Sequence, residues 1–404
     1  MRNKLLLIEP FTFLPIKSGG HNRTFQTIRE LSKYYDLQTI VFYEDQKALK
    51  TTQEYLKTQQ VPQKYFPVKS KYIFSFLKFG IPYWFSDWYN RPLINTLKHT
   101  QDYDQLKTLI EYTQLLYLVD YLPKKSFKIF TAYDISSVSF WRRLVTEPNL
   151  GKKILGFFRW IEIYLFERKY FPRFDLVIAV SKHDATFLKK YFNVKRVEVI
   201  SNGIDRIHQL PIRKSDGYLN LGFIGPVSHP PNLQARQFLL SNIAPELDRQ
   251  NLKYRIIIAG DDKSLLQLGV GRPGVKYLGY VDNLEDFYQQ IDVLVVPIFA
   301  GSGSRIKILE SLSFGRPVIT TAVGAEGIDV KSPFLKIIPK SGENSPSAWV
   351  DTLSQLQAIP PNTPANLAKL NQLLNQNAWE KLFADKSKIF LEWFGVVMET
   401  KSFS

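Results

Sequence analysis

Residues 293–310, VLVVPIFAGSGSRIKILE, decide the fold of this chain. Four apolar residues end at Pro297, a stretch of glycine and serine follows, and a helical pattern begins near Arg305. A short apolar run of this kind is typical of a parallel strand that is buried on both faces. The sequence therefore predicts a strand, a glycine loop and a helix, which is the unit that builds an open α/β sheet.

The same order of strand, loop and helix recurs along the chain. Residues 5–8 predict a first strand, residues 15–20 a glycine loop, residues 25–31 a helix and residues 36–42 a second strand. Further short apolar runs predict strands at residues 128–132, 176–180, 197–200, 219–224, 254–259, 275–278 and 318–320. We therefore expect an α/β fold with two doubly wound Rossmann-type domains that face a central cleft.

The boundary between the two domains is predicted at the turn that contains Asn202 and Gly203. We expect an N-terminal domain over residues 1–203 and a C-terminal domain over residues 204–378. Residues 379–404 have helical spacing and are expected to form a terminal helix that packs back towards the N-terminal domain. Residues 341–364 contain proline and asparagine and are expected to be a loose connection.

The composition restricts the class of protein. The 404 residues are 45% hydrophobic and 22% charged, as in a globular protein, and they include no cysteine, which excludes disulfides and thiol chemistry. The apolar run at residues 5–8 is too short for a signal peptide, and no window reaches the 18 or more apolar residues expected of a membrane span. These features favour a cytoplasmic location.

The net positive charge of the chain comes almost entirely from its first half. Residues 1–200 hold 32 Lys and Arg against 18 Asp and Glu, whereas the remaining residues hold 21 against 19. The basic residues of segments 64–91 and 151–173 alternate with aromatic residues, which suits the edge of an anionic membrane. We therefore expect peripheral attachment to the inner face of the membrane, the alternative being that half of these aromatics are core. The chain has no recognisable nucleic-acid-binding motif, so no nucleic-acid partner is expected.

The chemistry of the opening stretch follows from its residue types. A helix that begins near Arg305 directs its first backbone N–H groups and its positive end at any ligand above the strand. Arg305 and Lys307 add two cations, a combination that suits a diphosphate. Glu310 is placed to accept hydrogen bonds from both hydroxyls of a ribose. The loop residues expected around this ligand are Gly301, Ser302, Gly303 and Ser304.

Several segments resemble family 4 of the glycosyltransferases (glycosyl transferases group 1), which are retaining enzymes of the GT-B fold. The resemblance is carried by residues 301–310 (GSGSRIKILE) with 313–321 (SFGRPVITT), and it extends to residues 18–20, 174–181, 199–205, 221–225 and 258–260. Each segment alone is weak evidence for the resemblance, but the order and spacing of the segments together are specific to the family.

The resemblance implies a nucleoside-diphosphate sugar as donor and co-substrate, held by the C-terminal domain, with neither a cofactor nor a metal. It implies a glycan or lipid-linked acceptor held by the N-terminal domain, as in the synthesis of polysaccharides or glycoconjugates. Glu310 is implied to bind the ribose, and Arg305, Lys307 and the N–H groups of Ile308 and Leu309 the diphosphate. The glycine loops at Gly19, Gly20 and Gly225 are also implied to face the substrates, and His21 follows the first of them.

The chain departs from the family pattern at three places. Ser302 stands where the family has the first of two glutamates, and the loop 226–232 lacks the usual cation after Gly225. Tyr133 stands where many relatives have a histidine. Beside it, Asp134 is expected to be a catalytic residue of the cleft, the alternative being an N-cap of the next helix. These departures leave open a second interpretation, an inactive GT-B module that binds a nucleotide or a partner.

Overall fold

The computed structural model describes residues 4–16, 18–69, 71–99, 106–211, 213–260, 272–301, 303–358 and 363–384. By their contacts, the residues form two compact units, residues 1–199 with 298–305 and residues 200–297 with 306–404. The contacts therefore place the division after residue 199, where we expected it after residue 203, and they assign the loop 298–305 to the first unit.

The first unit contains a parallel sheet in the order β3-β2-β1-β4-β5-β6-β7. Its strands are β1 (Lys4–Glu9), β2 (Asp36–Tyr43), β3 (Gln63–Pro67), β4 (Lys107–Glu111), β5 (Lys128–Ala132), β6 (Leu176–Ala179) and β7 (Val197–Val199). Five of these strands are those that the sequence predicts in this half. The short strands β3 and β4 were not predicted because each mixes polar with apolar residues.

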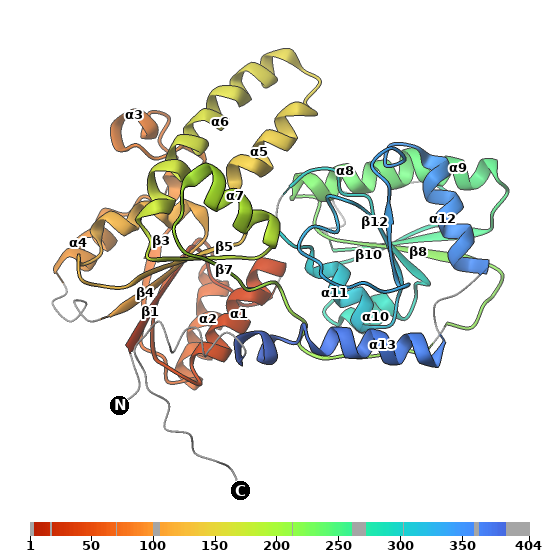
Figure 1. Cartoon of the computed structure of the whole chain (residues 1–404), viewed down its shortest axis with the longest axis horizontal. Coiled ribbons are helices and arrows are strands. Elements are labelled where there is room, and N and C mark those ends of the chain that lie inside the picture. Colours follow the sequence, from red (N-terminus) through yellow and green to blue (C-terminus); the bar gives the residue numbers. More distant parts are fainter. Residues whose placement is uncertain are drawn as a thin grey trace, which may run out of the picture. The chain divides into compact units, whose positions relative to one another are not determined.

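Helices cover both faces of this sheet. In Figure 1, α1 and α2 lie on one face and α4, α6 and α7 on the other. The helices are α1 (Gly19–Leu31), α2 (Gln46–Thr58), α3 (Ser75–Phe79), α4 (Arg91–His99), α5 (Ser136–Val145), α6 (Leu150–Tyr170) and α7 (Lys182–Phe192), with 3₁₀ segments η1 (Tyr83–Trp88), η3 (Thr113–Tyr121) and η4 (Phe171–Arg173).

The second unit contains a parallel sheet in the order β10-β9-β8-β11-β12-β13, which is the strand order of a dinucleotide-binding fold. Its strands are β8 (Leu219–Ile224), β9 (Tyr254–Ala259), β10 (Val275–Gly279), β11 (Val293–Val296), β12 (Val318–Thr321) and β13 (Leu335–Ile338). Its helices are α8 (Pro230–Phe238), η5 (a π-turn, Leu239–Ile243), α9 (Ala244–Arg249), α10 (Leu284–Tyr288), α11 (Ile306–Ser313), α12 (Pro346–Ala358) and α13 (Pro364–Asn375). Strand β13 was not predicted.

Three expectations need correction or lie partly outside the described residues. Gly19 and Gly20 are not in a loop, because they form the first turn of α1, where the Ser18 side chain accepts from the His21 N–H. The segment 341–364 contains the helix α12 and is not a loose connection. Residues 379–384 are helical, and the Trp379 N–H donates to the Ile204 carbonyl within the second unit. The remainder of the expected terminal helix lies outside the described residues.

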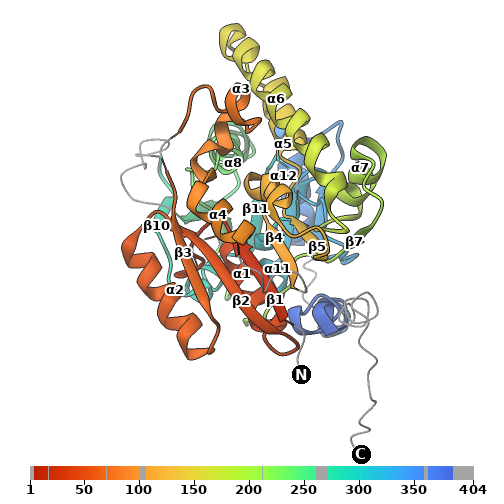
Figure 2. The ribbon, with the colours of Figure 1, turned by 90° about the vertical axis from the view of Figure 1, so that its left-hand side faces the viewer.

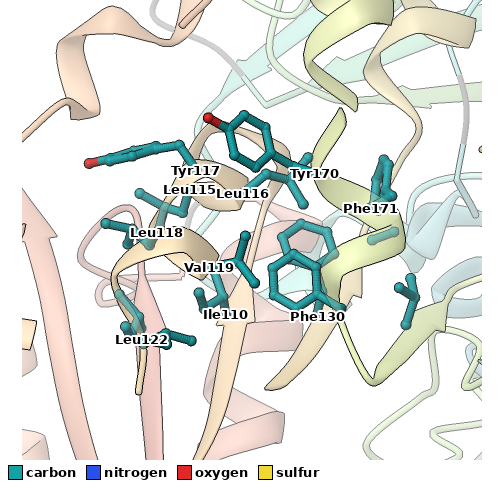
Figure 3. Close-up of a cluster of buried hydrophobic side chains, with 14 of the residues drawn as sticks. Ile110, Leu115, Leu116, Tyr117, Leu118, Val119, Leu122, Phe130, Tyr170 and Phe171 are labelled. Carbon is teal, nitrogen blue, oxygen red and sulfur yellow. The ribbon is translucent and has the colours of Figure 1, made fainter. Parts of the chain in front are cut away.

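An apolar core holds strand ends of the first unit in place. Figure 3 shows Ile110 of β4 and Phe130 of β5 packed against side chains of the 3₁₀ segments η3 and η4. Phe130 and Phe171 are fully buried, with their ring centroids 5.4 Å apart. Burial of one such side chain contributes about 1.5–3 kcal/mol, so the strands that carry the candidate site are fixed by packing.

The strand order reverses at one place in each sheet, between β1 and β4 in the first unit and between β8 and β11 in the second. Open α/β sheets bind ligands beyond the carboxyl ends of the strands at such a point. The residues at the ends of these four strands are therefore the first candidates for a functional site.

Candidate active site

The Lys307 ammonium lies at the carboxyl end of β8. Its Nζ donates to the Ile224 carbonyl at 2.5 Å and to Asn232 Oδ1 at 2.9 Å. The same Nζ lies 5.0 Å from the centroid of the Phe223 ring, a cation–π contact. Lys307 comes from the first turn of α11, and Asn232 from the first turn of α8. A cation is therefore held where the second sheet reverses its strand order.

Only a glycine at position 225 permits this arrangement. Gly225 follows β8 with a φ of 146°, a backbone conformation that L side chains rarely adopt. A Cβ there would lie 2.6 Å from Lys307 Nζ and 2.7 Å from Asn232 Nδ2. The predicted site residues Gly225 and Lys307 therefore meet, and the absence of a side chain on Gly225 leaves room for the ammonium.

The helix α11 begins at Ile306 and presents its N-terminal end beside Lys307. The first four N–H groups of an α-helix have no partner within the helix, and in α11, which begins at Ile306, these include the N–H group of Ile308. The helix dipole makes this end positive. The backbone of α11 and the Lys307 side chain thus supply positive charge at the same end of the second sheet.

Glu310 is the fifth residue of α11 and is half-buried. Burial raises the pKa of its carboxyl group to about 7, although the charge of Lys307 acts in the opposite direction. The neighbouring Tyr288 donates from its hydroxyl to the Lys307 carbonyl at 3.3 Å. Because its pKa lies near neutrality, Glu310 changes its charge in the pH range in which enzymes work.

The loop 298–305 carries the remaining predicted residues, and its contacts are with the first unit. Arg142 Nη1 donates to the Gly301 carbonyl at 2.5 Å, and Arg305 Nη1 donates to the Gly303 carbonyl at 2.7 Å. A Cβ on Gly303 would collide with the Tyr133 carbonyl, so this position requires glycine. Ser304 is half-buried, whereas Ser302 lies outside the described residues.

Asp134 follows β5 and accepts hydrogen bonds from Ser139 Oγ at 3.1 Å and from Ser136 Oγ at 3.5 Å. Burial raises the pKa of its carboxyl group to about 6. The N-terminus of α5 is capped by Glu167, which accepts from the N–H groups of Ser136 and Ser137 at 2.8 and 3.1 Å. Asp134 is therefore not the N-cap of α5, and that alternative is wrong.

A pair of buried carboxylates lies where the first sheet reverses its strand order. Glu9 ends β1 and Glu111 ends β4, both are fully buried, and their strands are neighbours. Thr24 Oγ1 lies 3.3 Å from Glu9 Oε2 and 3.4 Å from Glu111 Oε2. The Tyr133 hydroxyl donates to Glu111 Oε2 at 2.5 Å. Of the predicted site residues, Tyr133 alone belongs to this cluster through its side chain.

Two close carboxylates in a dry site cannot both be ionised at low cost. Burial raises the pKa of Glu9 well above its usual value of 4.5, and the charge of Glu111 raises it further. The Arg23 guanidinium lies 5.3 Å from the centroid of the Tyr133 ring, and Tyr112 stacks on Tyr133 with centroids 4.0 Å apart. The buried pair therefore favours the protonated form of Glu9.

Sequence reasoning missed Glu9, Glu111 and Asn232. Glu9 directly follows the first predicted strand, so its position at a strand end was visible in the sequence. Glu111 was not, because β4 was not predicted. Of the other predicted residues, Gly20 packs against the Tyr112 hydroxyl, Gly19 is exposed, and the His21 ring lies 5.0 Å from that of Phe11.

Solved structures share this two-sheet fold at low sequence identity. Sucrose-phosphate synthase from Thermosynechococcus elongatus superimposes with a TM-score of 0.69 at 13% identity, over 98% of this chain and 100% of that one. Anabaena Alr3699/HepE in complex with UDP and glucose gives a TM-score of 0.61 at 14% identity, over 97% and 100%. The E. coli trehalose-6-phosphate protein bound with UDP-2-fluoro glucose gives 0.61 at 12%, over 98% and 100%. The fold is therefore GT-B.

Two stretches of the sequence match families of known proteins. Residues 219–357 match the family described as glycosyl transferases group 1, and residues 146–207 match Glycosyltransferase Family 4. With the GT-B fold, these matches support the resemblance to the group 1 glycosyltransferases that the sequence indicated. A curated relative, an uncharacterized 44.6 kDa protein in the cps region of Klebsiella pneumoniae, is 22% identical over 249 residues, which are 59% of this chain and 62% of that protein.

Proposed function

We propose that the protein transfers a sugar from a nucleoside-diphosphate sugar to a glycan or lipid-linked acceptor, with retention of configuration. The observation that carries the proposal is the Lys307 ammonium, held at the carboxyl end of β8 beside the N-terminus of α11. A diphosphate is the ligand that fits a fixed cation and free backbone N–H groups at the reversal point of a Rossmann-type sheet. Two of the structures with this fold have UDP or a UDP sugar bound.

The proposed chemistry gives each charged group a defined part. The bond between the anomeric carbon and the diphosphate breaks, and the acceptor oxygen bonds to the same face of that carbon. The acceptor proton passes to an oxygen of the departing diphosphate. Arg305, Lys307 and the N–H groups of Ile308 and Leu309 stabilise the charge that develops on the leaving group, without a metal. Glu310 binds the ribose hydroxyls.

The first unit is proposed to bind the acceptor. Asp134 sits at the carboxyl end of β5, where α/β sheets place reactive groups. Its raised pKa of about 6 makes it available to exchange a proton near neutral pH. A role in polysaccharide synthesis stays a prediction from the sequence resemblance.

The proposal is tested first by thermal shift with UDP-, GDP-, ADP- and TDP-sugars. One nucleotide class is expected to stabilise the folded protein by about 2.7 kcal/mol at a hundredfold excess over Kd. This stabilisation is detected as a higher melting temperature. Arg305→Ala is expected to weaken that binding about tenfold, because an arginine binds phosphate oxygens with charge-assisted hydrogen bonds. Arg249→Ala, an exposed arginine on α9, is the matched control and should bind as the wild type does.

Two results would contradict the assignment. If no nucleotide sugar shifts the wild-type melting temperature, the protein does not use such a donor. If a nucleotide sugar binds but is neither hydrolysed nor consumed with any glycan or lipid-linked acceptor, the inactive binding module is the correct interpretation.

We expect the affinity for the nucleotide sugar to increase about tenfold from pH 6 to pH 8. The reason is that burial raises the pKa of Glu310 to about 7, and the ionised carboxylate is the better acceptor for two ribose hydroxyls. The affinity is measured by titration calorimetry with the intact nucleotide sugar, whose diphosphate diester does not titrate near neutral pH. Glu310→Gln should bind more weakly and show no pH dependence. A variant that keeps the wild-type pH profile would show that another group is responsible.

A further inference from the structure

The first half of α6 carries large apolar side chains that face solvent. Leu150, Ile154, Leu155 and Phe158 are between 55% and 72% exposed. They belong to the first three turns of a helix of 21 residues, which is about 30 Å long. A soluble monomer rarely exposes contiguous apolar surface of this kind without a binding role.

The second half of the same helix behaves differently. Ile163, Phe166 and Tyr170 are buried and pack onto the first unit. Figures 1 and 2 show that α6 projects away from the sheet, with α5 beside it. The two helices are fixed to each other, because Trp160 Nε1 donates to the Ser137 carbonyl at 3.1 Å and the Trp141 and Trp160 rings lie 4.8 Å apart. The exposed apolar face is therefore part of a preformed helical hairpin.

The short helix α3 extends this apolar surface. Ile73, Phe74 and Leu77 are 68–84% exposed. The segment that follows α3 is anchored to the hairpin, since the Tyr83 N–H donates to Glu162 Oε2 at 3.2 Å and the Trp84 ring lies 6.1 Å from that of Phe140. We define the docking surface as the following exposed apolar residues of segment 73–84 and of the α5–α6 hairpin: Ile73, Phe74, Leu77, Trp84, Trp141, Val145, Leu150, Ile154, Leu155, Phe157 and Phe158.

Positive charge borders the docking surface. Residues 141–160 contain five Lys and Arg and one acidic residue, and residues 71–80 contain two lysines and no acidic residue. Lys152 and Lys153 are exposed in the first turn of α6. Lys71 Nζ lies 4.7 Å from the centroid of the Trp84 ring. Apolar side chains surrounded by lysine and arginine match the boundary between anionic headgroups and acyl chains.

The structure also separates these residues from the aromatics that the sequence grouped with them. Phe66, Phe79, Phe85, Trp88 and Tyr89 of segment 64–91 pack against the core of the first unit. The alternative that half of the aromatic residues in these segments belong to the core is therefore correct for these five residues. Apart from Tyr72 and Leu165, the large apolar side chains of segments 64–91 and 151–173 that remain exposed belong to the docking surface. They are richer in leucine and isoleucine than the sequence pattern suggested.

We propose that the docking surface binds the surface of an anionic lipid bilayer. The apolar side chains enter the boundary between headgroups and acyl chains, and the bordering lysines and arginines contact lipid phosphates. No helix among the described residues has the length and apolar character needed to cross a bilayer. The inference goes beyond the proposed function, since this binding requires neither donor nor acceptor.

The test is co-sedimentation of the full chain with phosphatidylcholine vesicles, with and without 30% phosphatidylglycerol (an experimental composition of roughly bacterial charge density). Wild-type protein should bind the anionic vesicles and release with salt. Lys152→Gln/Lys153→Gln should weaken binding about 25-fold, because each cation near an anionic surface contributes roughly a fivefold factor. Leu155→Ser/Phe158→Ser should weaken it at least about tenfold.

Two control variants make the result specific. Lys124→Gln/Lys125→Gln removes two exposed lysines of the same unit that lie before β5. Ile337→Ser removes an exposed apolar side chain of β13 in the second unit. Both should bind vesicles as the wild type does. Equal binding to neutral and anionic vesicles would overturn the proposal, and so would a lipid-free dimer that Leu155→Ser/Phe158→Ser dissociates. Because no substrate is present, neither outcome bears on the transferase assignment.

Discussion

Lys307→Ala is expected to lower kcat by about a hundred- to a thousandfold, the cost of removing one fixed group that stabilises developing charge. In the wild type, the Ile224 carbonyl and Asn232 Oδ1 hold the ammonium in position before the reaction begins. The protein therefore does not have to reorient this charge as the leaving group departs. The measurement is steady-state kinetics with the nucleotide sugar identified by thermal shift. The oxygen atoms of Ile224 and Asn232 that accept from Lys307 both belong to the second unit.

Three further variants sharpen that result. Lys331→Ala removes an exposed lysine of the same unit and should leave kcat unchanged. Asn232→Ala should give an intermediate loss of about tenfold, because Lys307 keeps its charge but loses the oxygen partner that Asn232 provides. Gly225→Ala should resemble Lys307→Ala, since the new Cβ would lie 2.6 Å from Nζ. Full activity in Lys307→Ala would show that the diphosphate is neutralised elsewhere.

Strands buried on both faces were the most predictable part of the fold. Residues 293–296 are a continuous apolar run, and residues 219–224 and 254–259 are interrupted only by Asn220 and Arg255 as side chains of strong polarity. The structure places β8, β9 and β11 over the same residues. Strand β4 reads KTLIE and carries too little of this signal, although the Thr108 side chain is buried. Its burial depends on neighbours in the sheet, which one short segment of sequence does not reveal.

The candidate site was predictable only where its residues are close in sequence. Lys307 and Glu310 share one helix, so a single motif contained both. The bond between Lys307 and Asn232 joins residues 75 positions apart, and Glu9 meets Glu111 only because β1 and β4 are neighbours. Pairing of this kind is set by the topology of the sheet. A carboxylate at the end of a predicted strand is therefore the feature of an α/β sequence that would best have indicated these site residues.

The Glu9→Gln variant is expected to become more stable relative to wild type as the pH rises from 5 to 9. Burial raises the pKa of Glu9 well above 4.5, so its contribution to stability is complete below about pH 4.5. That contribution is lost as the pH rises through the pKa of the folded state. Glutamine cannot ionise, so the variant escapes this loss, which is about 1.4 kcal/mol for each unit by which the pKa is raised.

Thermal unfolding of wild type and variant at pH 5, 7 and 9 measures this effect. Burial also raises the pKa of Glu167 to about 8, but Glu167 is present in both proteins and cancels in the difference between them. At pH 5 the variant should be no more stable than wild type, and its stability relative to wild type should rise towards pH 9. Glu54→Gln, an exposed carboxylate on α2, is the control and should follow the wild-type curve. If the stabilities of Glu9→Gln and wild type run parallel from pH 5 to 9, burial and the neighbouring Glu111 do not raise the pKa of Glu9 in the folded protein.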